Sequence, residues 1–141
     1  MKRNMFGALM TLIVAFAVAT PMVHAQTIMT ANVPFAFSVG QQQLPAGAYA
    51  VRELNSAATL IQNKDGNEKA LALYQSAGPS KSDETKLVFH KIGDHYFLTE
   101  IWSSVRGQGQ ALPESKLEKE MEASNAGIGG GGVETVIVAL R

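Results

Sequence analysis

Apolar and polar residues alternate along several short segments of this chain, and residues typical of turns separate those segments. The clearest case is Val33–Val39, where every second residue is Val or Phe. A period of two is typical of a β-strand that buries one face. Asp65-Gly66, which lies between apolar runs at 59–62 and 69–74, is a strong signal for a β-hairpin. The pattern therefore predicts antiparallel strands joined by short turns, rather than strands that alternate with helices.

Near the end of the chain the pattern changes from strand to helix and back. A proline followed by several acidic residues indicates a helix at about 114–124. Leu117 and Met121 lie four residues apart and are its only large apolar anchors, so we expect a weakly docked surface helix. The Gly-rich segment 127–132 predicts a flexible linker. The β-branched stretch at about 133–140 predicts a final strand.

Together these segments predict an all-β, mainly antiparallel domain of about seven strands. Because the strands follow one another through short turns, we expect a small meander β-barrel with one surface helix before the last strand. The final strand is apolar on both faces, which suits a strand that closes the structure or is covered by the helix. A β-sandwich is the alternative architecture.

The first 25 residues have the pattern of a secretory signal peptide. Lys2 and Arg3 precede an almost uncharged run that ends near Thr20, and Val23-His24-Ala25 resembles a cleavage site. The run is shorter than the about 20 apolar residues that a membrane-spanning helix needs. We therefore expect a signal peptide at 1–25, a single β-rich domain at 26–141 without a membrane anchor, and export to the periplasm or the cell exterior.

The composition limits how the fold can be stabilised and which partners the protein can bind. The chain has no cysteine, so it has neither a disulfide nor a thiolate metal site. Once Lys2 and Arg3 are removed with the leader, ten basic and twelve acidic residues remain. This slight acidity gives no electrostatic reason to bind nucleic acid, which we exclude as a partner.

The stretch from Lys86 to Trp102 predicts a second hairpin with Gly93-Asp94 as its loop. Glycine at the first of two loop positions fits a type II′ turn, so Ile92 should face His95. In this register five large side chains share the face that we assign to the core. They are Leu87, Phe89, Tyr96, Leu98 and Trp102. The opposite face carries Val88, His90, Ile92, His95, Phe97, Thr99 and Ile101.

The same register places His90 and His95 diagonally across the hairpin, within loose reach of one metal ion. Asp94 could supply an oxygen ligand, but Glu100 lies on the other face. A zinc site needs at least three protein ligands, and the pair does not meet that requirement. We interpret the stretch as a structural hairpin with semi-exposed histidines and predict no metal ligand.

The evidence for a catalytic motif is as weak as that for a metal site. No G-x-S-x-G motif of a serine hydrolase occurs. The glycine run at 129–132 leads into a strand, whereas a phosphate-binding loop leads into a helix. We interpret the helix glutamates Glu114, Glu118, Glu120 and Glu122 as a solvated face. The sequence therefore predicts no catalytic residue, no cofactor and no enzyme activity.

Four stretches resemble a family of small exported proteins of unknown function predicted from acidobacterial genomes. They are N-V-P-F-A-F-S-V-G (32–40), L-P-A-G-A-Y (44–49), K-L-V-F-H-K-I-G-D-H-Y-F-L (86–98) and L-P-E-S-K-L-E-K-E (112–120). The resemblance implies an exported β-rich domain and no catalytic residues. The P-A-G-x-Y piece is also similar to β-sandwich modules, which supports the sandwich alternative.

These features predict an exported, non-enzymatic binding or structural protein with either a protein partner or a small apolar ligand. A lipocalin-like carrier of such a ligand inside a barrel is the alternative. An enzyme that depends on a metal ion or on His90 or His95 is a distant third.

Overall fold

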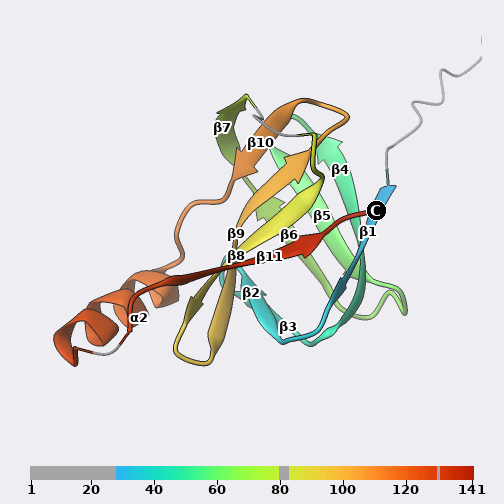
Figure 1. Ribbon diagram of the computed structural model, residues 1–141. Coiled ribbons are helices and arrows are strands. Elements are labelled where there is room, and N and C mark those ends of the chain that lie inside the picture. Colours follow the sequence, from blue (N-terminus) through green and yellow to red (C-terminus); the bar gives the residue numbers. More distant parts are fainter. Residues whose placement is uncertain (1–27, 80–82, 130) are drawn as a thin grey trace, which may run out of the picture.

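The structure is a computed structural model that describes residues 28–79, 83–129 and 131–141, so the predicted signal peptide lies outside the described residues (Figure 1). The described residues form eleven strands and the helix α2 (Lys116–Gly127). The strands are β1 (Ile28–Val33), β2 (Phe37–Val39), β3 (Gln42–Leu44), β4 (Gly47–Asn55), β5 (Ala58–Asn63), β6 (Lys69–Leu73), β7 (Gln75–Pro79), β8 (Lys86–Ile92), β9 (His95–Ser103), β10 (Gln108–Ala111) and β11 (Glu134–Ala139).

The strands fall into two sheets. Sheet A has the order β1-β4-β5-β6, and sheet B has the order β11-β8-β9-β10-β7 with β2 beside β9 and β3 beside β2. Pairing is antiparallel except between β2 and β9, where Ser38 lies opposite Phe97. The predicted mainly antiparallel β fold with one helix before the last strand is confirmed.

The described residues contain eleven strands, more than the about seven that were expected. The predicted strand at Val33–Val39 spans the last residue of β1, a break at 34–36 and all of β2, and the two strands belong to different sheets. Pro34 lies in the break between them. Proline has no backbone N–H to donate to a sheet, so the chain leaves sheet A there and joins sheet B.

A core of apolar side chains from both sheets lies between them. Phe37 makes edge-to-face contacts with Tyr49 at 5.2 Å and with Phe89 at 5.4 Å between ring centroids. Phe35 stacks on Tyr96 at 3.9 Å and meets Phe89 edge-on at 5.2 Å. The centre of the molecule is thus filled by interlocking aromatic rings.

The sheets meet along two edges. At one edge Thr30 of β1 and Arg141, beyond β11, exchange two backbone hydrogen bonds of 2.8 and 2.9 Å. At the other edge the Gln42 Nε2 donates to the Lys69 carbonyl at 2.6 Å. Two sheets are expected of the sandwich alternative, whereas backbone hydrogen bonds between sheet edges, found here at the Thr30–Arg141 edge alone of the two, are expected of a barrel.

The β8–β9 hairpin has the predicted register from its loop up to the pair Phe89–Leu98. Gly93 takes a positive φ of 59°, as the predicted turn requires. Beyond that pair Val88 lies opposite Glu100, so Thr99 is an extra residue in β9 and forms a β-bulge.

The bulge reverses the alternation of side chains for the rest of β9. Ile101 is therefore buried in the core, whereas Trp102 is half-buried on the opposite side. The predicted core position of Trp102 and outer position of Ile101 were wrong for this reason.

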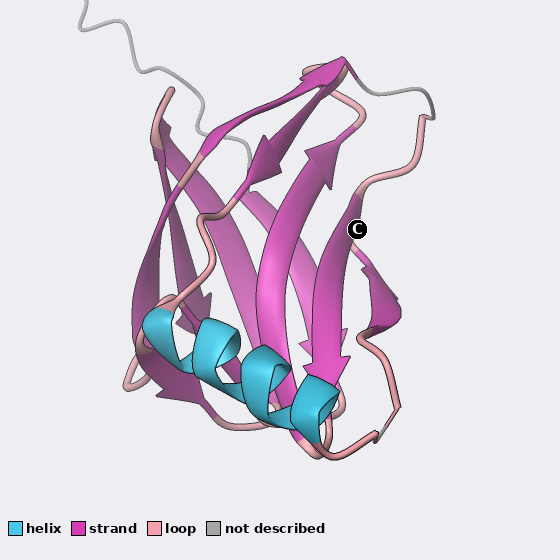
Figure 2. Ribbon diagram, turned by 90° about the vertical axis from the view of Figure 1, so that its left-hand side faces the viewer, coloured by secondary structure: helices cyan, strands magenta, loops and turns pink. Residues whose placement is uncertain are grey.

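The helix α2 begins later and ends later than predicted. Its N-cap is Ser115, whose side chain accepts a hydrogen bond from the Glu118 amide at 3.1 Å. Leu117, predicted to dock the helix, is 47% exposed. The helix lies against sheet B beside β8 (Figure 2). The final strand, β11, agrees with its predicted position.

Candidate functional site

The face of α2 that meets sheet B is polar rather than apolar. Ser115 and Glu118 are buried, and Met121, Glu122 and Asn125 are half-buried, whereas most of the remaining helix residues are exposed. Residues three and four positions apart share a helix face, so the N-cap at Ser115 directs Glu118 and Glu122 toward the sheet. A buried polar face beside an exposed leucine departs from ordinary helix patterning, and such departures are expected at functional or strained positions.

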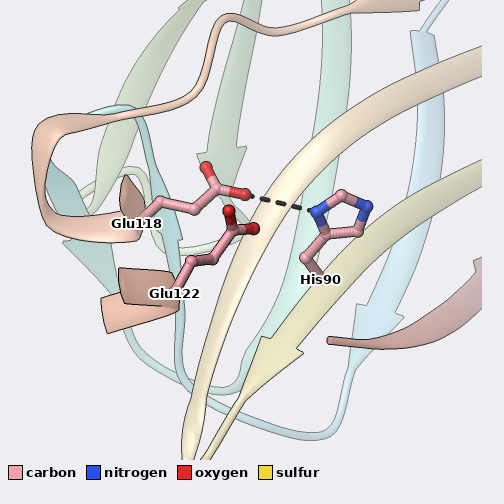
Figure 3. A group of neighbouring side chains, drawn as sticks. All are labelled: His90, Glu118 and Glu122. Atoms are coloured by element: carbon pink, nitrogen blue, oxygen red, sulfur yellow. Dashed lines mark ion pairs between the residues drawn. The ribbon is translucent and has the colours of Figure 1, made fainter. Parts of the chain in front are cut away.

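His90 projects from β8 toward this helix face, and it is the sheet residue that meets the two glutamates. Figure 3 shows the three side chains converging, with Glu118 and Glu122 one helical turn apart. The Nδ1 of His90 lies 3.3 Å from the Oε1 of Glu118. One donor atom from each of His90, Glu118 and Glu122 lies within 4.8 Å of the other two.

Glu118 is the chemically unusual member of the cluster because it is only 3% exposed. Burial raises the pKa of its carboxyl group above the ordinary value, and the charge of Glu114 acts in the same direction. A hydrogen bond from the Ser115 backbone amide and the nearby His90 imidazole oppose that rise in pKa. Within the described part of the chain, the Oε1 of Glu118 and the Nδ1 of His90 have no hydrogen-bond partner. The two atoms are therefore close but poorly aligned for a hydrogen bond to each other.

The structure corrects the predicted role of the helix glutamates and separates the two histidines. Glu118 is buried against sheet B and does not belong to a solvated face. His95 is exposed at the start of β9. In the ranges described above, no group of three potential ligands includes His95 or Asp94. His90, predicted to be semi-exposed, is confirmed as such, with 33% of its side chain accessible.

The sequence contained part of the signal for this cluster. Ser115-Lys-Leu-Glu118 matches the S-x-x-E capping box, which would have placed the helix start at Lys116, two residues after the predicted start at about 114. Glu118 and Glu122 are four residues apart and therefore lie on one helix face. The pairing of this face with His90 depends on how α2 packs on β8, and no local pattern encodes that packing.

A second candidate surface is the outer face of sheet A. The cross-strand register aligns Ile28, Arg52, Leu60 and Leu71 in one row across all four strands. Ile28 and Leu71 are each 52% exposed, and Leu73, two residues along β6, is 60% exposed. Exposed apolar side chains gathered on one sheet face are a common feature of interaction surfaces.

The charge on this outer face has one sign. Its described side chains include the cations Arg52 and Lys69 and no acid. By cross-strand register the outer face consists of Ile28, Thr30, Asn32, Ala48, Ala50, Arg52, Asn55, Ala58, Leu60, Gln62, Lys69, Leu71 and Leu73. The Nε of Arg52 is buried and lacks a hydrogen-bond partner within the described residues. A surface concavity of about 390 Å³ adjoins the row and is lined in part by Leu60, Lys69 and Leu71.

No helix in the described ranges is both long enough and apolar enough to cross a membrane. A comparison with family models, curated proteins and solved structures finds no match to this chain.

Proposed function

We propose that this chain is an exported, non-enzymatic binding protein that docks a protein partner on the outer face of sheet A. The observation that carries the proposal is the row Ile28–Arg52–Leu60–Leu71, in which exposed apolar side chains flank a cation. Such a row is costly to leave in water, and its burial against a partner is favourable at roughly 25 cal/mol per Å² of apolar surface.

The partner is a segment of another protein that presents a carboxylate between apolar side chains. Arg52 and Lys69 supply positive charge on a face whose described side chains include no acid. Arg52 is half-buried, and a guanidinium group forms its strongest hydrogen bonds with a carboxylate. Charge complementarity of this kind sets the specificity and association rate of a complex more than its affinity.

The filled core supports a protein partner over an apolar ligand held inside the fold. Phe37, Tyr49 and Phe89 occupy the space between the sheets and are at most 1% exposed. The concavity of about 390 Å³ opens on the outer side of sheet A, and another of about 470 Å³ is lined by Thr30, Val138 and Arg141 near the edge where the sheets meet. A lipocalin-like carrier requires its cavity inside the sheets.

Export is the second part of the proposal and rests on the leader pattern of residues 1–25 and on the resemblance of four stretches to exported proteins. Sequencing the N-terminus of the protein recovered from outside the cytoplasm should give Gln26 as the first residue. A protein that retains Met1 there would overturn the predicted cleavage.

The docking surface is tested by photo-crosslinking in the native host. A photoreactive amino acid at position 71 should capture one protein, and mass spectrometry should place the crosslink in a segment rich in Asp or Glu. The matched control is the same amino acid at position 117, because Leu117 is 47% exposed and Leu71 is 52% exposed.

A second experiment separates charge from apolar contact. Arg52→Gln combined with Lys69→Gln keeps the leucines and should strongly reduce the position-71 crosslink. The proposal is wrong if position 117 captures the same protein, if position 71 captures only lipid or another copy of this chain, or if the double variant crosslinks as well as the parent.

A further inference from the structure

We propose that His90, Glu118 and Glu122 form a binding site for one divalent transition-metal ion, of which Zn²⁺ is the representative, between β8 and α2. The site is separate from the outer face of sheet A, so it does not depend on the proposed partner. The three ligands come from two elements that are not neighbours in sequence, which means that only the folded chain presents them together.

The separation of the donor atoms fits a metal ion. Ligands bound to zinc at about 2.0–2.2 Å in tetrahedral geometry lie about 3.3–3.6 Å from one another. The Nδ1 of His90 and the Oε1 of Glu118 are already 3.3 Å apart. Glu122 completes the group within 4.8 Å, and its half-buried side chain has rotatable bonds that allow the remaining approach.

Two polar atoms of the site have no hydrogen bond that would account for their burial. Among the described residues, the Nδ1 of His90 and the Oε1 of Glu118 are buried and have no hydrogen-bond partner, although each faces the other. Buried polar atoms normally have a partner, because leaving one unsatisfied costs the full desolvation of that group. A cation placed between the two atoms would accept a lone pair from each and remove both penalties.

The ligand set selects the class of ion. One imidazole nitrogen with two carboxylate oxygens suits zinc and similar first-row transition ions. Calcium and magnesium prefer six or more ligands that are all oxygen atoms. Three protein ligands leave at least one coordination position for water. The Ser115 amide, which hydrogen-bonds to Glu118, would orient that carboxylate from outside the metal shell.

The experiment titrates Zn²⁺ into chelator-treated, full-length mature protein by calorimetry. We expect one Zn²⁺ per chain, an increase in Tm, and no comparable effect of Mg²⁺. His90→Gln and Glu122→Gln should each weaken Zn²⁺ binding by about tenfold or more, because even residues behind the ligands typically contribute 10–100-fold. Substitution with Co²⁺ should give an absorption band that either variant loses.

Two control variants lie outside the cluster. Glu120→Gln removes a carboxylate from an exposed position of the same helix, and His95→Gln removes the other histidine of the hairpin. Both should bind Zn²⁺ within about twofold of the parent, since surface substitutions have small effects. Glu122 is only half-buried, so Glu122→Gln should retain the fold. This variant therefore tests the site even if a substitution of the buried Glu118 unfolds the protein.

Hydrogen exchange gives a second readout that does not measure affinity. Zn²⁺ should slow exchange of the α2 amides in the parent and leave their exchange unchanged in Glu122→Gln. The proposal is overturned if the parent does not bind Zn²⁺, if His95→Gln weakens binding as much as His90→Gln does, or if Zn²⁺ leaves α2 exchange unaltered.

Discussion

At the scale of single residues, aromatic side chains and their hydroxyl groups determine how the core is held. Tyr49 is fully buried, and its hydroxyl donates a short 2.5 Å hydrogen bond to the Pro45 carbonyl. Burial also raises the pKa of this hydroxyl group, so it remains a donor. The L-P-A-G-A-Y stretch is thus one unit, in which a turn and a buried tyrosine are linked four residues apart.

Phe89 provides the sharpest single-residue prediction. It is 0% exposed and touches both Phe35 and Phe37, so Phe89→Ala should cost about 3–5 kcal/mol of unfolding free energy through lost burial and a residual cavity. His95→Gln on the same hairpin changes an exposed residue and should stay within about 0.5 kcal/mol. Chemical denaturation in the presence of a chelator compares the two, and equal losses would contradict the structural role of Phe89.

At the scale of elements, the bulge in β9 creates a packing arrangement that depends on one glycine. Trp102 is the cross-strand partner of Gly109 in β10. A Cβ atom at position 109 would lie 2.6 Å from the Trp102 ring. The indole ring therefore covers the glycine backbone, and its Nε1 donates a 2.6 Å hydrogen bond to Glu100.

Gly109→Ala should therefore destabilise the protein by about 1–3 kcal/mol, the usual cost of forcing extra atoms into a packed site. In a Trp102→Ala background, Gly109→Ala should lower the unfolding free energy only slightly, because the clashing ring is absent. A double-mutant cycle measured by denaturation gives the coupling between the two positions. Additive effects would show that the ring does not cover Gly109.

Local sequence patterns predict elements well here and their mutual contacts poorly. The hairpin register near Gly93 and the position of the final strand followed from turn chemistry and from β-branched residues. The bulge at Thr99 did not follow, because its stabilising contacts are tertiary: the Thr99 hydroxyl donates to the Val88 carbonyl, and the Leu112 amide donates to the Thr99 carbonyl. The cluster around Glu118 was missed for the same reason.

The weak docking of α2 leads to a prediction at this scale. The helix meets β8 through a polar face, and its largest apolar residue on the first turn, Leu117, is 47% exposed. In metal-free protein its amides should therefore be the least protected of any regular element. Hydrogen exchange with mass spectrometry tests this prediction, with β8 as the internal reference. Protection of α2 equal to that of β8 would contradict it.

At the scale of the whole molecule, stability depends on one core that both sheets share. The chain has no cysteine to form a disulfide. The core side chains come from all four strands of sheet A and from β2, β3, β8 and β9 of sheet B. The backbone hydrogen bonds between Thr30 and Arg141 join the two sheets at one edge. Sheet A and sheet B should therefore unfold as one unit, as expected of a single small domain.

Ile61→Ala tests this cooperativity with a probe in the other sheet. Ile61 lies in β5 of sheet A and is 0% exposed, so its truncation should cost about 2–5 kcal/mol. Trp102, the single tryptophan of the chain, lies in β9 of sheet B. Its fluorescence during urea unfolding reports on the sheet that does not contain the mutation. If the core is shared, the unfolding free energy derived from Trp102 fluorescence falls by the full cost of Ile61→Ala. The fluorescence transition then coincides with the transition measured by far-UV circular dichroism. Two separate transitions, or an unchanged Trp102 midpoint, would show that the sheets are energetically independent despite their common core.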